Sequence, residues 1–305
     1  MMSAPNVSEA LLLHLQRRGC QGRIVSVDHL HDLRGEISER RSGGPIDPKL
    51  YQEYLAGFSF EPPESLPNAA SLIVVAVPSP QARVVFTLRG KSVPTIIPPT
   101  YVGYTPVRQQ MAAFISEVLA PAGFRVAHTA LPQKLLATHS GLAKYGRNNI
   151  TYVEGMGSFQ RLASYYSDMP CLEDHWGESQ QLERCESCVA CLRNCPTGAI
   201  ASERFFLHAE RCLTFLNELP GDFPAWVAPE WHNCLVGCMR CQSICPEDKE
   251  FVHWFGEQEE FTEEETSLIL EGIPRDRLPA ATMEKLERLS MFDYFDVLPR
   301  NLRAL

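Results

Sequence analysis

Hydrophobic positions in the first 170 residues follow two periodicities, one helical and one extended. Leu11, Leu12 and Leu15 predict an amphipathic helix over residues 8–18. The continuous apolar run Ser71–Val77, stopped by Pro78, predicts a strand covered on both faces of a mixed or parallel sheet. Weaker patterns predict further strands over 23–27, 83–88, 124–128, 150–153 and 161–166, and helices over 107–119 and 133–138. Strand and helix signals thus alternate, which favours an α/β layer structure in this half.

Other segments lack a clear period. Charged residues and paired glycines and prolines between Asp32 and Pro67 predict an irregular surface segment. The proline-rich stretch Lys91–Pro106 predicts a folded-over loop, because proline cannot donate to a sheet ladder. Gly141–Asn149 combines two glycines with two cationic side chains and predicts a turn. The acidic run Glu257–Glu265 predicts the solvated face of a helix in the C-terminal tail.

Charge and hydropathy narrow the class of protein. The 305 residues include 28 Lys and Arg against 37 Asp and Glu, a formal charge of −9 that disfavours nucleic acid as a partner. The apolar run Ala10–Leu13 follows Glu9 and is soon interrupted by polar residues, so it fits neither a signal peptide nor a membrane span. We therefore expect a cytoplasmic protein without membrane attachment.

The cysteines carry the strongest chemical signal. Nine of the 11 cysteines lie between Cys185 and Cys245, a clustering that indicates metal rather than disulfides. The first run, CESCVACLRNCP from Cys185, has the spacing Cys-x2-Cys-x2-Cys-x3-Cys-Pro of the bacterial ferredoxin motif for 4Fe–4S clusters. A second run, CMRCQSICP from Cys238, repeats the latter half of that pattern. Zinc sites are the competing interpretation, which this order of spacings disfavours.

The ferredoxin pattern also predicts which cysteines share a cluster. If the last cysteine of each run binds the other cluster, the first cluster takes Cys185, Cys188, Cys191 and Cys245. The second cluster then takes Cys195, Cys238 and Cys241, with Cys212 or Cys234 as its fourth ligand.

On these residues the chain resembles the epoxyqueuosine reductase family, cobalamin-dependent iron–sulfur enzymes that reduce an epoxide on a modified tRNA base. The segments that carry the resemblance are PNAASLIVVAV at 67–77, GLAKYGRNNITYVEGMGS at 141–158, the first cysteine run with its PTGAI tail, AERCLTFLNE at 209–218 and GCMRCQSICPED at 237–248.

The resemblance implies an α+β fold in three parts. These are an α/β cobalamin-binding-type domain with a mixed sheet over 1–175, a two-cluster ferredoxin-like domain over 176–252 and a short helical tail over 253–305. It also implies that Cys212 is the fourth ligand of the second cluster, leaving Cys234 as a spare thiol. The residues it places beside the cobalamin are Tyr145, Gly146, Arg147, Asn148, Asn149, Gly157 and Ser158.

Two departures from the family change the expected chemistry. The family's aspartate proton donor has no counterpart here, because no acidic residue lies between Arg125 and Gly141. His128 is the nearest substitute and His139 a weaker one, since histidine can donate a proton near neutral pH. Many family members also continue into a C-terminal helical-repeat domain thought to help hold tRNA, and we expect this chain to be a short member without it. We therefore expect a reductase of a small electrophilic molecule rather than of tRNA.

Partners follow from this chemistry. A low-potential donor such as a ferredoxin or flavodoxin is expected to reduce the clusters, which pass electrons to cobalamin. The alternative is an electron-transfer protein, or a reductive activator of a partner corrinoid protein, with no substrate chemistry of its own. That alternative needs both clusters but no proton donor.

Overall fold

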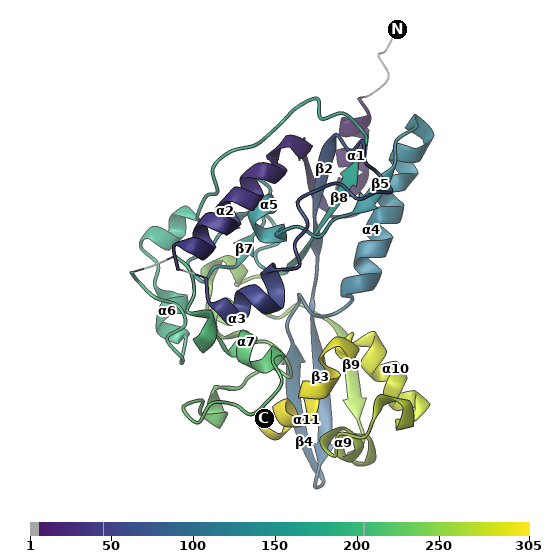
Figure 1. Ribbon diagram of the computed structural model, residues 1–305. Helices are drawn as coiled ribbons and strands as arrows, with labels where there is room; N and C mark the ends of the chain where they lie inside the picture. The colour runs from purple at the N-terminus through teal and green to yellow at the C-terminus, as the bar shows by residue number, and fades with distance from the viewer. Residues whose placement is uncertain (1–5, 45, 204) are drawn as a thin grey trace. The chain divides into compact units, whose positions relative to one another are not determined.

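The computed structural model describes residues 6–44, 46–203 and 205–305 (Figure 1). The chain divides into two compact units, each built from two segments of sequence. The first unit holds the described residues up to Pro78 together with Thr105–Ser187, and the second holds Ser79–Tyr104 and Cys188–Leu305. An N-terminal hairpin therefore belongs with the cysteine-rich segment. The domain limits predicted at residues 175 and 252 are a separate division and stay a prediction.

A four-stranded sheet forms the centre of the first unit. Its strands lie in the order β1 (Gln21–Ser26), β2 (Ser71–Pro78), β8 (Gln160–Ser167) and β5 (Val126–His128). The predicted strand at 71–77 is confirmed as β2, and its burial on both faces is confirmed too. However, β2 runs antiparallel to both of its neighbours, so the prediction of a mixed or parallel arrangement is wrong for this sheet.

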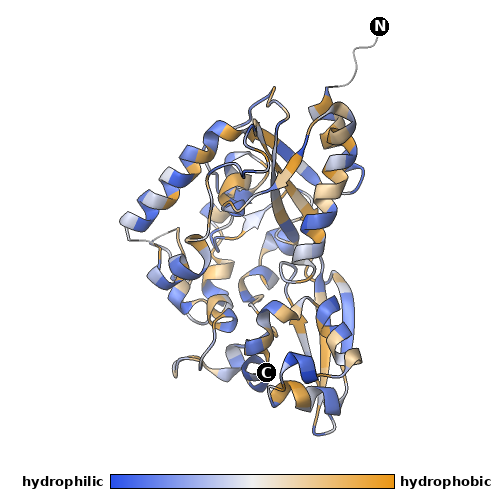
Figure 2. Cartoon of the chain, turned by 45° about the vertical axis from the view of Figure 1, so that its right-hand side comes forward, coloured by the Kyte–Doolittle hydropathy of each residue, from blue (hydrophilic) through white to orange (hydrophobic). Residues whose placement is uncertain are grey.

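Helices cover both faces of this sheet. Ile73 and Val75 of β2 belong to a core formed with α1 and α4, whereas Leu72 and Val74 belong to a core formed with α2 and α5. Figure 1 shows the two pairs of helices on opposite sides of β2 and β8, and Figure 2 shows the strands as mainly hydrophobic. These helices are α1 (Val7–Gln16), α2 (Leu30–Ser42), α4 (Tyr104–Leu119) and α5 (Gln133–His139).

The segment 32–67 is more regular than its composition predicts. Most of α2 lies in it, followed by the short helix α3 (Pro48–Leu50) and a π-helical turn over Tyr51–Leu55. Leu30 and Leu33 of α2 are buried, Ile37 packs partly buried against the same core, and the remaining side chains are mostly polar. These three residues lie three or four positions apart on one helix face, and this is enough to hold α2 on the sheet.

The second unit contains a mixed three-stranded sheet in the order β4, β3, β9. β3 (Gln81–Leu88) pairs antiparallel with β4 (Lys91–Ile97) and parallel with β9 (Phe255–Phe261). The prediction of a loop over 91–106 is wrong for its first seven residues, which form strand β4. Pro94 is tolerated there because β4 is an edge strand, on which alternate N–H groups have no ladder partner.

The acidic run 257–265 is also only partly helical. Its first half forms β9, where Glu259 and Phe261 are buried while their neighbours are exposed. Arg288 donates to Glu259 and neutralises the buried carboxylate. The run then enters α9 (Glu263–Leu270) after Thr262, whose side chain forms a capping box with Glu265. The first half of the run is therefore a strand with alternating buried and exposed side chains, where the prediction was a solvated helix face. Arg288, which is distant in sequence, makes the burial of Glu259 possible.

The remaining elements complete an α+β fold with a mixed sheet and a helical C-terminal segment, so the predicted fold class is confirmed. Within the described ranges, no helix is both long and apolar enough to cross a membrane. The other elements are β6 (Lys144–Tyr145), β7 (Thr151–Tyr152), α6 (Ala190–Asn194), α7 (Leu213–Glu218), α8 (Arg240–Ser243), α9 (Glu263–Leu270), α10 (Ala280–Arg288) and α11 (Leu298–Arg303).

Candidate functional site

Residues 146–150 form a closed turn. The Gly146 N–H donates to the Ile150 carbonyl at 2.7 Å, and the Asn149 N–H donates to the Gly146 carbonyl at 2.9 Å. Asn149 has a φ of +58°, in the left-handed region that asparagine tolerates. The buried Asn148 side chain donates to the Tyr152 hydroxyl at 2.9 Å and accepts from the Ile150 N–H at 3.3 Å. A Cβ at Gly146 would lie 2.5 Å from Asn148 Oδ1, so the turn requires glycine.

The turn lies against the segment that leads to the first cysteine. The Tyr145 N–H donates to the Gln180 carbonyl, and the Leu182 N–H donates to the Tyr145 carbonyl, each at 2.8 Å. In this register the Arg147 N–H points at Cys185 Sγ, 3.4 Å away. Arg147 Nη2 also donates to the Cys185 carbonyl at 2.5 Å. The backbone N–H and Nη2 of Arg147 therefore both lie on the first cysteine of the ferredoxin-type run.

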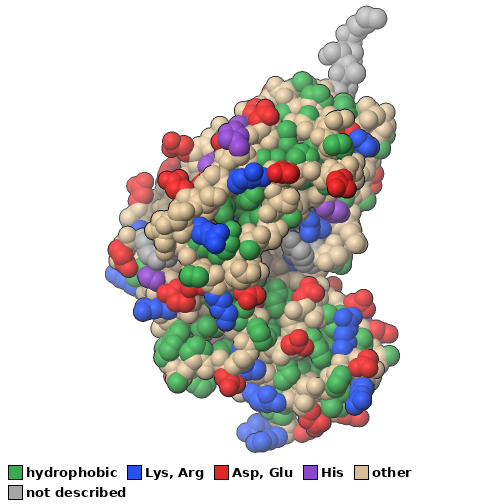
Figure 3. All heavy atoms as spheres, in the orientation of Figure 1, with side chains coloured by type: hydrophobic (Ala, Val, Ile, Leu, Met, Phe, Trp, Pro, Cys, Tyr) green, Lys and Arg blue, Asp and Glu red, His purple; other side chains and the backbone are tan. Residues whose placement is uncertain are grey.

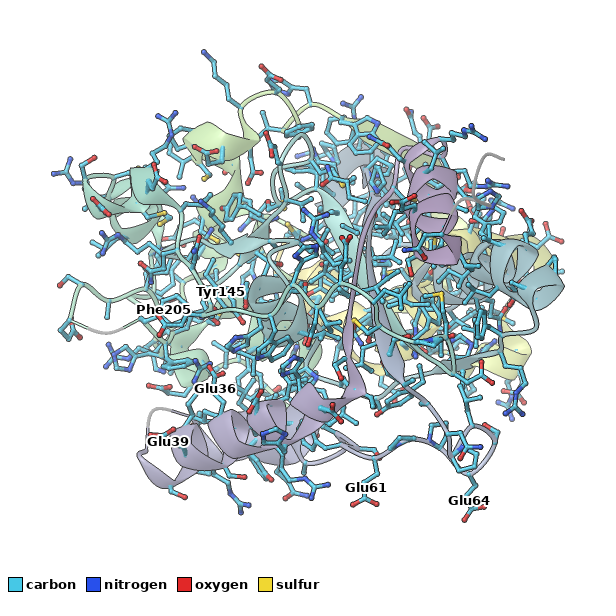
Figure 4. The ribbon with its side chains drawn as sticks, turned by 90° about the horizontal axis from the view of Figure 1, so that it is seen from above. Glu36, Glu39, Glu61, Glu64, Tyr145 and Phe205 are labelled. Carbon is cyan, nitrogen blue, oxygen red and sulfur yellow. The ribbon has the colours of Figure 1, made fainter. Side chains whose placement is uncertain are left out.

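Tyr145 faces inward. Burial raises the pKa of its hydroxyl to about 12, while the charge of Arg40 and a hydrogen bond with Thr138 oppose the rise. Arg40 is ion-paired with Glu36, and Glu36 Oε2 lies 2.7 Å from His139 Nε2. Figure 4 shows Glu36 on the side of α2 that faces Tyr145, whereas Glu61 and Glu64 point outward. The Tyr145 side chain thus belongs to an internal polar network.

An open cleft of about 480 Å³ lies beside this network. His139 forms part of its wall, with Nδ1 2.6 Å from the Gly177 carbonyl in addition to the Glu36 contact, so both ring nitrogens are engaged. The rings of His139 and His29 both stack on Trp176, with centroids 4.8 Å and 4.2 Å from its ring. The rest of the wall is formed by Leu12, Arg23, Thr138, Ser140, Gly141, Ala143, Lys144, His175, Trp176, Gly177, Glu178 and Gln180.

Gly157 and Ser158 lie in a second turn of the same unit. The Val153 N–H donates to the Gly157 carbonyl at 3.0 Å, and Gly157 has a φ of +56°, which favours glycine. Ser158 is buried. The positive φ therefore explains why a glycine stands at position 157. The role of Gly157 and Ser158 beside a cofactor stays a prediction.

His128 lies at the end of β5, the edge strand of the four-stranded sheet. Its exposed ring lies beside Tyr165, with centroids 5.5 Å apart. Partial burial and the charge of Arg108 lower its pKa below the ordinary histidine value. Its neighbours thus belong to the sheet and to α4, and its catalytic role stays a prediction.

Three predicted ligands of the second cluster are close neighbours in the second unit. Burial raises the pKa of the Cys212 thiol to about 11, as does its proximity to Cys238, while hydrogen bonds from Thr214 and Phe215 oppose the rise. Burial also raises the pKa of Cys238, which lies near Cys195. Cys212 directly precedes α7, which brings its sulfur near the backbone N–H groups of Thr214 and Phe215. Such donors suit a thiolate, so this environment fits a cluster ligand.

Cys234 has different surroundings. It is almost fully buried and lies within 3.0 Å of Asn233 Oδ1, an acceptor that suits a protonated thiol. Burial raises its pKa well above the ordinary value, against one opposing hydrogen bond from Met239. Sequence reasoning missed Asn233, which also donates from Nδ2 to Cys238 Sγ at 3.3 Å. Its position just before Cys234 was the available signal.

The other cysteines lie on or beside the short helices of the cysteine-rich segment. α6 carries Cys191 and packs against α8, which carries Cys241. Cys185 is in the first unit and Cys188 opens the second, so the boundary falls within the first run. In the described ranges no three acidic, histidine or cysteine side chains surround a single metal-ion position. The ligand sets predicted from the spacing therefore stay a prediction.

Comparison with known proteins supports the double cluster directly. Residues 184–248 match the family model described as a 4Fe-4S double cluster binding domain. This range contains both cysteine runs as well as Cys212 and Cys234. The chain thus carries a domain of the double 4Fe–4S type.

The same comparisons confirm the resemblance to epoxyqueuosine reductases. The chain is 35% identical over 141 residues to epoxyqueuosine reductase of Pseudomonas aeruginosa, covering 45% of this chain and 38% of that protein. It is 37% identical over 115 residues to the enzyme of Escherichia coli K12, covering 37% of this chain and 29% of that protein. The matched part therefore spans less than two-fifths of either relative.

Solved structures show the same fold over nearly the whole chain. Epoxyqueuosine reductase from Streptococcus thermophilus matches 98% of this chain and 80% of its own, with a TM-score of 0.68 and 17% identity. An epoxyqueuosine reductase solved with an epoxyqueuosine-modified tRNA-Tyr stem loop matches 98% of this chain and 81% of its own, with a TM-score of 0.69 and 22% identity. At these identities the likeness establishes the fold alone.

Proposed function

We propose that this epoxyqueuosine reductase-like chain is an oxidoreductase that passes electrons through two 4Fe–4S clusters to a corrinoid, which reduces a small electrophilic substrate. The observation that supports this most directly is the pairing of Arg147 with Cys185. It joins the loop that resembles the family's cofactor loop to the first cysteine of the ferredoxin-type run. A cluster that takes Cys185 as a ligand would therefore be linked to this loop by direct contacts.

Each cysteine set has a defined role in this proposal. Cys195, Cys212, Cys238 and Cys241 would hold the second cluster, which would supply an entry point for electrons from a ferredoxin or flavodoxin. Cys185, Cys188, Cys191 and Cys245 would hold the first cluster, which would supply the one-electron centre nearest the corrinoid. Potentials of such clusters span roughly −700 to +450 mV and depend on hydrogen bonds to the sulfurs.

A bound corrinoid supplies a cobalt centre that becomes a strong nucleophile when reduced. The cleft in the first unit offers donors that suit its amides and phosphate, because Arg23, Lys144 and His175 lie in its wall. Tyr145, Gly146 and Asn148 face the interior of the unit, so cleft residues and backbone groups of the loop would make most contacts with the cofactor.

The proposed substrate is a small electrophile, and His128 is the proposed proton donor. Lys and Arg side chains are scattered among Asp and Glu on the face seen in Figure 3, and the net charge is −9. A polyanion such as tRNA is bound best by gathered positive charge. Epoxyqueuosine-modified tRNA remains the comparison substrate for every assay.

Electron paramagnetic resonance of the anaerobically reconstituted protein tests the relay. We expect two 4Fe–4S signals, and added cob(II)alamin should change to a base-off signal and be reduced when a low-potential donor is supplied. Cys188→Ala should keep the second cluster but lose cobalamin reduction. Normal reduction by an iron-depleted Cys188→Ala protein would contradict the relay.

The outcomes also separate the alternative function. If both clusters form but the cobalt signal stays that of free cobalamin, the chain is an electron-transfer protein or an activator of another corrinoid protein. If cobalamin binds and is reduced, small epoxides and organohalides are assayed against epoxyqueuosine-modified tRNA. Faster turnover of the tRNA would overturn the proposed substrate class while leaving the relay intact.

A further inference from the structure

We propose that Arg147 is a positioning residue of the first cluster, which it stabilises in the reduced state. The inference rests on the proposed function, because it takes Cys185 as a ligand of that cluster. It assigns to Arg147 a role that differs from contact with the corrin. The assignment follows from the positions of the backbone N–H and Nη2 of Arg147 against Cys185.

The turn holds the Arg147 N–H in place. Gly146 and Asn149 close the turn through their backbone, and Asn148 fills its interior. The two backbone hydrogen bonds between Tyr145 and residues 180 and 182 then fix the register of the loop against the segment that leads to Cys185. The Arg147 N–H lies 3.4 Å from Cys185 Sγ as a result, and on the Arg147 side this contact depends on the backbone alone.

The guanidinium adds a positive charge at the same ligand. Arg147 Nη2 donates to the Cys185 carbonyl at 2.5 Å, so the charge lies beside the backbone of the ligand rather than in solvent. Cys185 is also held by its own N–H, which donates to the Leu182 carbonyl at 2.9 Å. Sulfur, carbonyl and N–H of Cys185 are therefore all engaged within the first unit.

Both donors favour the reduced cluster for the same electrostatic reason. Reduction adds one negative charge that is shared between the cluster and its thiolate ligands. An N–H aimed at the sulfur and a nearby cation stabilise that added charge, which raises the reduction potential. Arg147 thus makes the first cluster easier to reduce than a cluster with the same ligands and a neutral side chain.

Redox titration of the reconstituted protein, followed by electron paramagnetic resonance without cobalamin, tests this. In Arg147→Gln the first cluster should become harder to reduce by about tenfold in equilibrium constant, or ~59 mV for a one-electron couple. Arg147→Lys should recover part of the shift, and the second cluster should stay unchanged. The first signal is identified by its loss in Cys185→Ala.

Lys144→Gln is the matched control, because it removes a cation from the same loop that lies 3.9 Å from the exposed Glu183. It should leave both potentials unchanged. Unchanged potentials in Arg147→Gln, or equal shifts in Arg147→Gln and Lys144→Gln, would overturn the proposal. Selective loss of the first cluster in Arg147→Gln, with the second intact, would support it. Because this titration contains no cobalamin, a negative result would count against the role of Arg147 and would leave the test of electron transfer to cobalamin unaffected.

Discussion

The side-chain amide of Asn233 donates a hydrogen bond to the sulfur of Cys238 at 3.3 Å. The oxygen of the same amide accepts the Met239 N–H at 2.8 Å and lies 3.0 Å from Cys234 Sγ. One neutral side chain therefore holds a proposed cluster ligand, the start of the next helical turn and a buried thiol. It is the counterpart, at the second cluster, of Arg147 at the first.

Replacing Asn233 by leucine should lower the reduction potential of the second cluster only. The substitution keeps the side-chain volume but removes the N–H aimed at Cys238, which stabilises the added negative charge. Asn233→Asp should lower the potential further, because it places a carboxylate beside the sulfur. Redox titration measures both. If the reduction potential of the first cluster changed instead, the ligand sets assigned to the two clusters would have to be exchanged.

The fourth ligand of the second cluster should be Cys212 and not Cys234. Cys212→Ala should lose about four irons per chain, whereas Cys234→Ala should keep both clusters. The reason is that Thr214 and Phe215 donate to the Cys212 sulfur, whereas Cys234 has a single donor, Met239, and also faces the acceptor Asn233 Oδ1. Iron content and electron paramagnetic resonance spectra provide the measurement. Loss of iron from Cys234→Ala with retention in Cys212→Ala would reverse the assignment.

If His128 donates the proton, turnover should fall as pH rises through its pKa, because only the protonated ring can donate. Partial burial and Arg108 lower that pKa, so the fall should lie below the ordinary histidine value of about 6.5. His128→Gln should lower kcat by roughly 10²-fold or more and remove this limb of the pH profile.

Arg108→Gln provides the control for His128. It removes the neighbouring charge, so the limb should move to higher pH while kcat at low pH changes little. A pH profile of His128→Gln that matches the unmodified protein would show that the proton comes from elsewhere.

Trp176→Ala should reduce the free energy of unfolding by about 2 kcal/mol, because the ring stacks on both His29 and His139. Trp176→Phe keeps an aromatic ring and should lose about half as much. Urea denaturation measures both variants. Hydrogen exchange should also become faster in residues 177–182, which lead to Cys185. A Trp176→Ala protein as stable as the unmodified chain would show that the stacking contributes nothing.

The sequence predicted best those features that depend on near neighbours. β2 is recognised because its apolar run is continuous, and the cluster domain because ligand spacing is a local property. β4 was missed because the tolerance of Pro94 depends on which strand lies at the edge. The strand character of residues 255–261 was missed because Glu259 is buried only with Arg288 beside it, 29 positions away.

The site shows the same division. The cysteines were found by spacing alone, whereas the contact of Arg147 with Cys185 depends on the register between residues 145–147 and 180–185. His29 and Trp176 were not singled out, since nothing in their immediate sequence distinguishes them from ordinary polar or aromatic residues, and Asn233 was missed although it directly precedes Cys234. Their partners lie on other elements, and only the fold brings them together.

The parallel pairing of β3 with β9 affects how the protein is made. β3 is the central strand of its sheet, and its partner on one side, β9, is synthesised about 170 residues later. Leu235 and Val236 of the cysteine-rich segment are buried with Phe86 and Phe261, from these two strands. On the ribosome the cysteines therefore emerge before the core beneath them can close. Cluster insertion and the last stage of folding should consequently be coupled events, completed only after the C-terminal strand has left the exit tunnel.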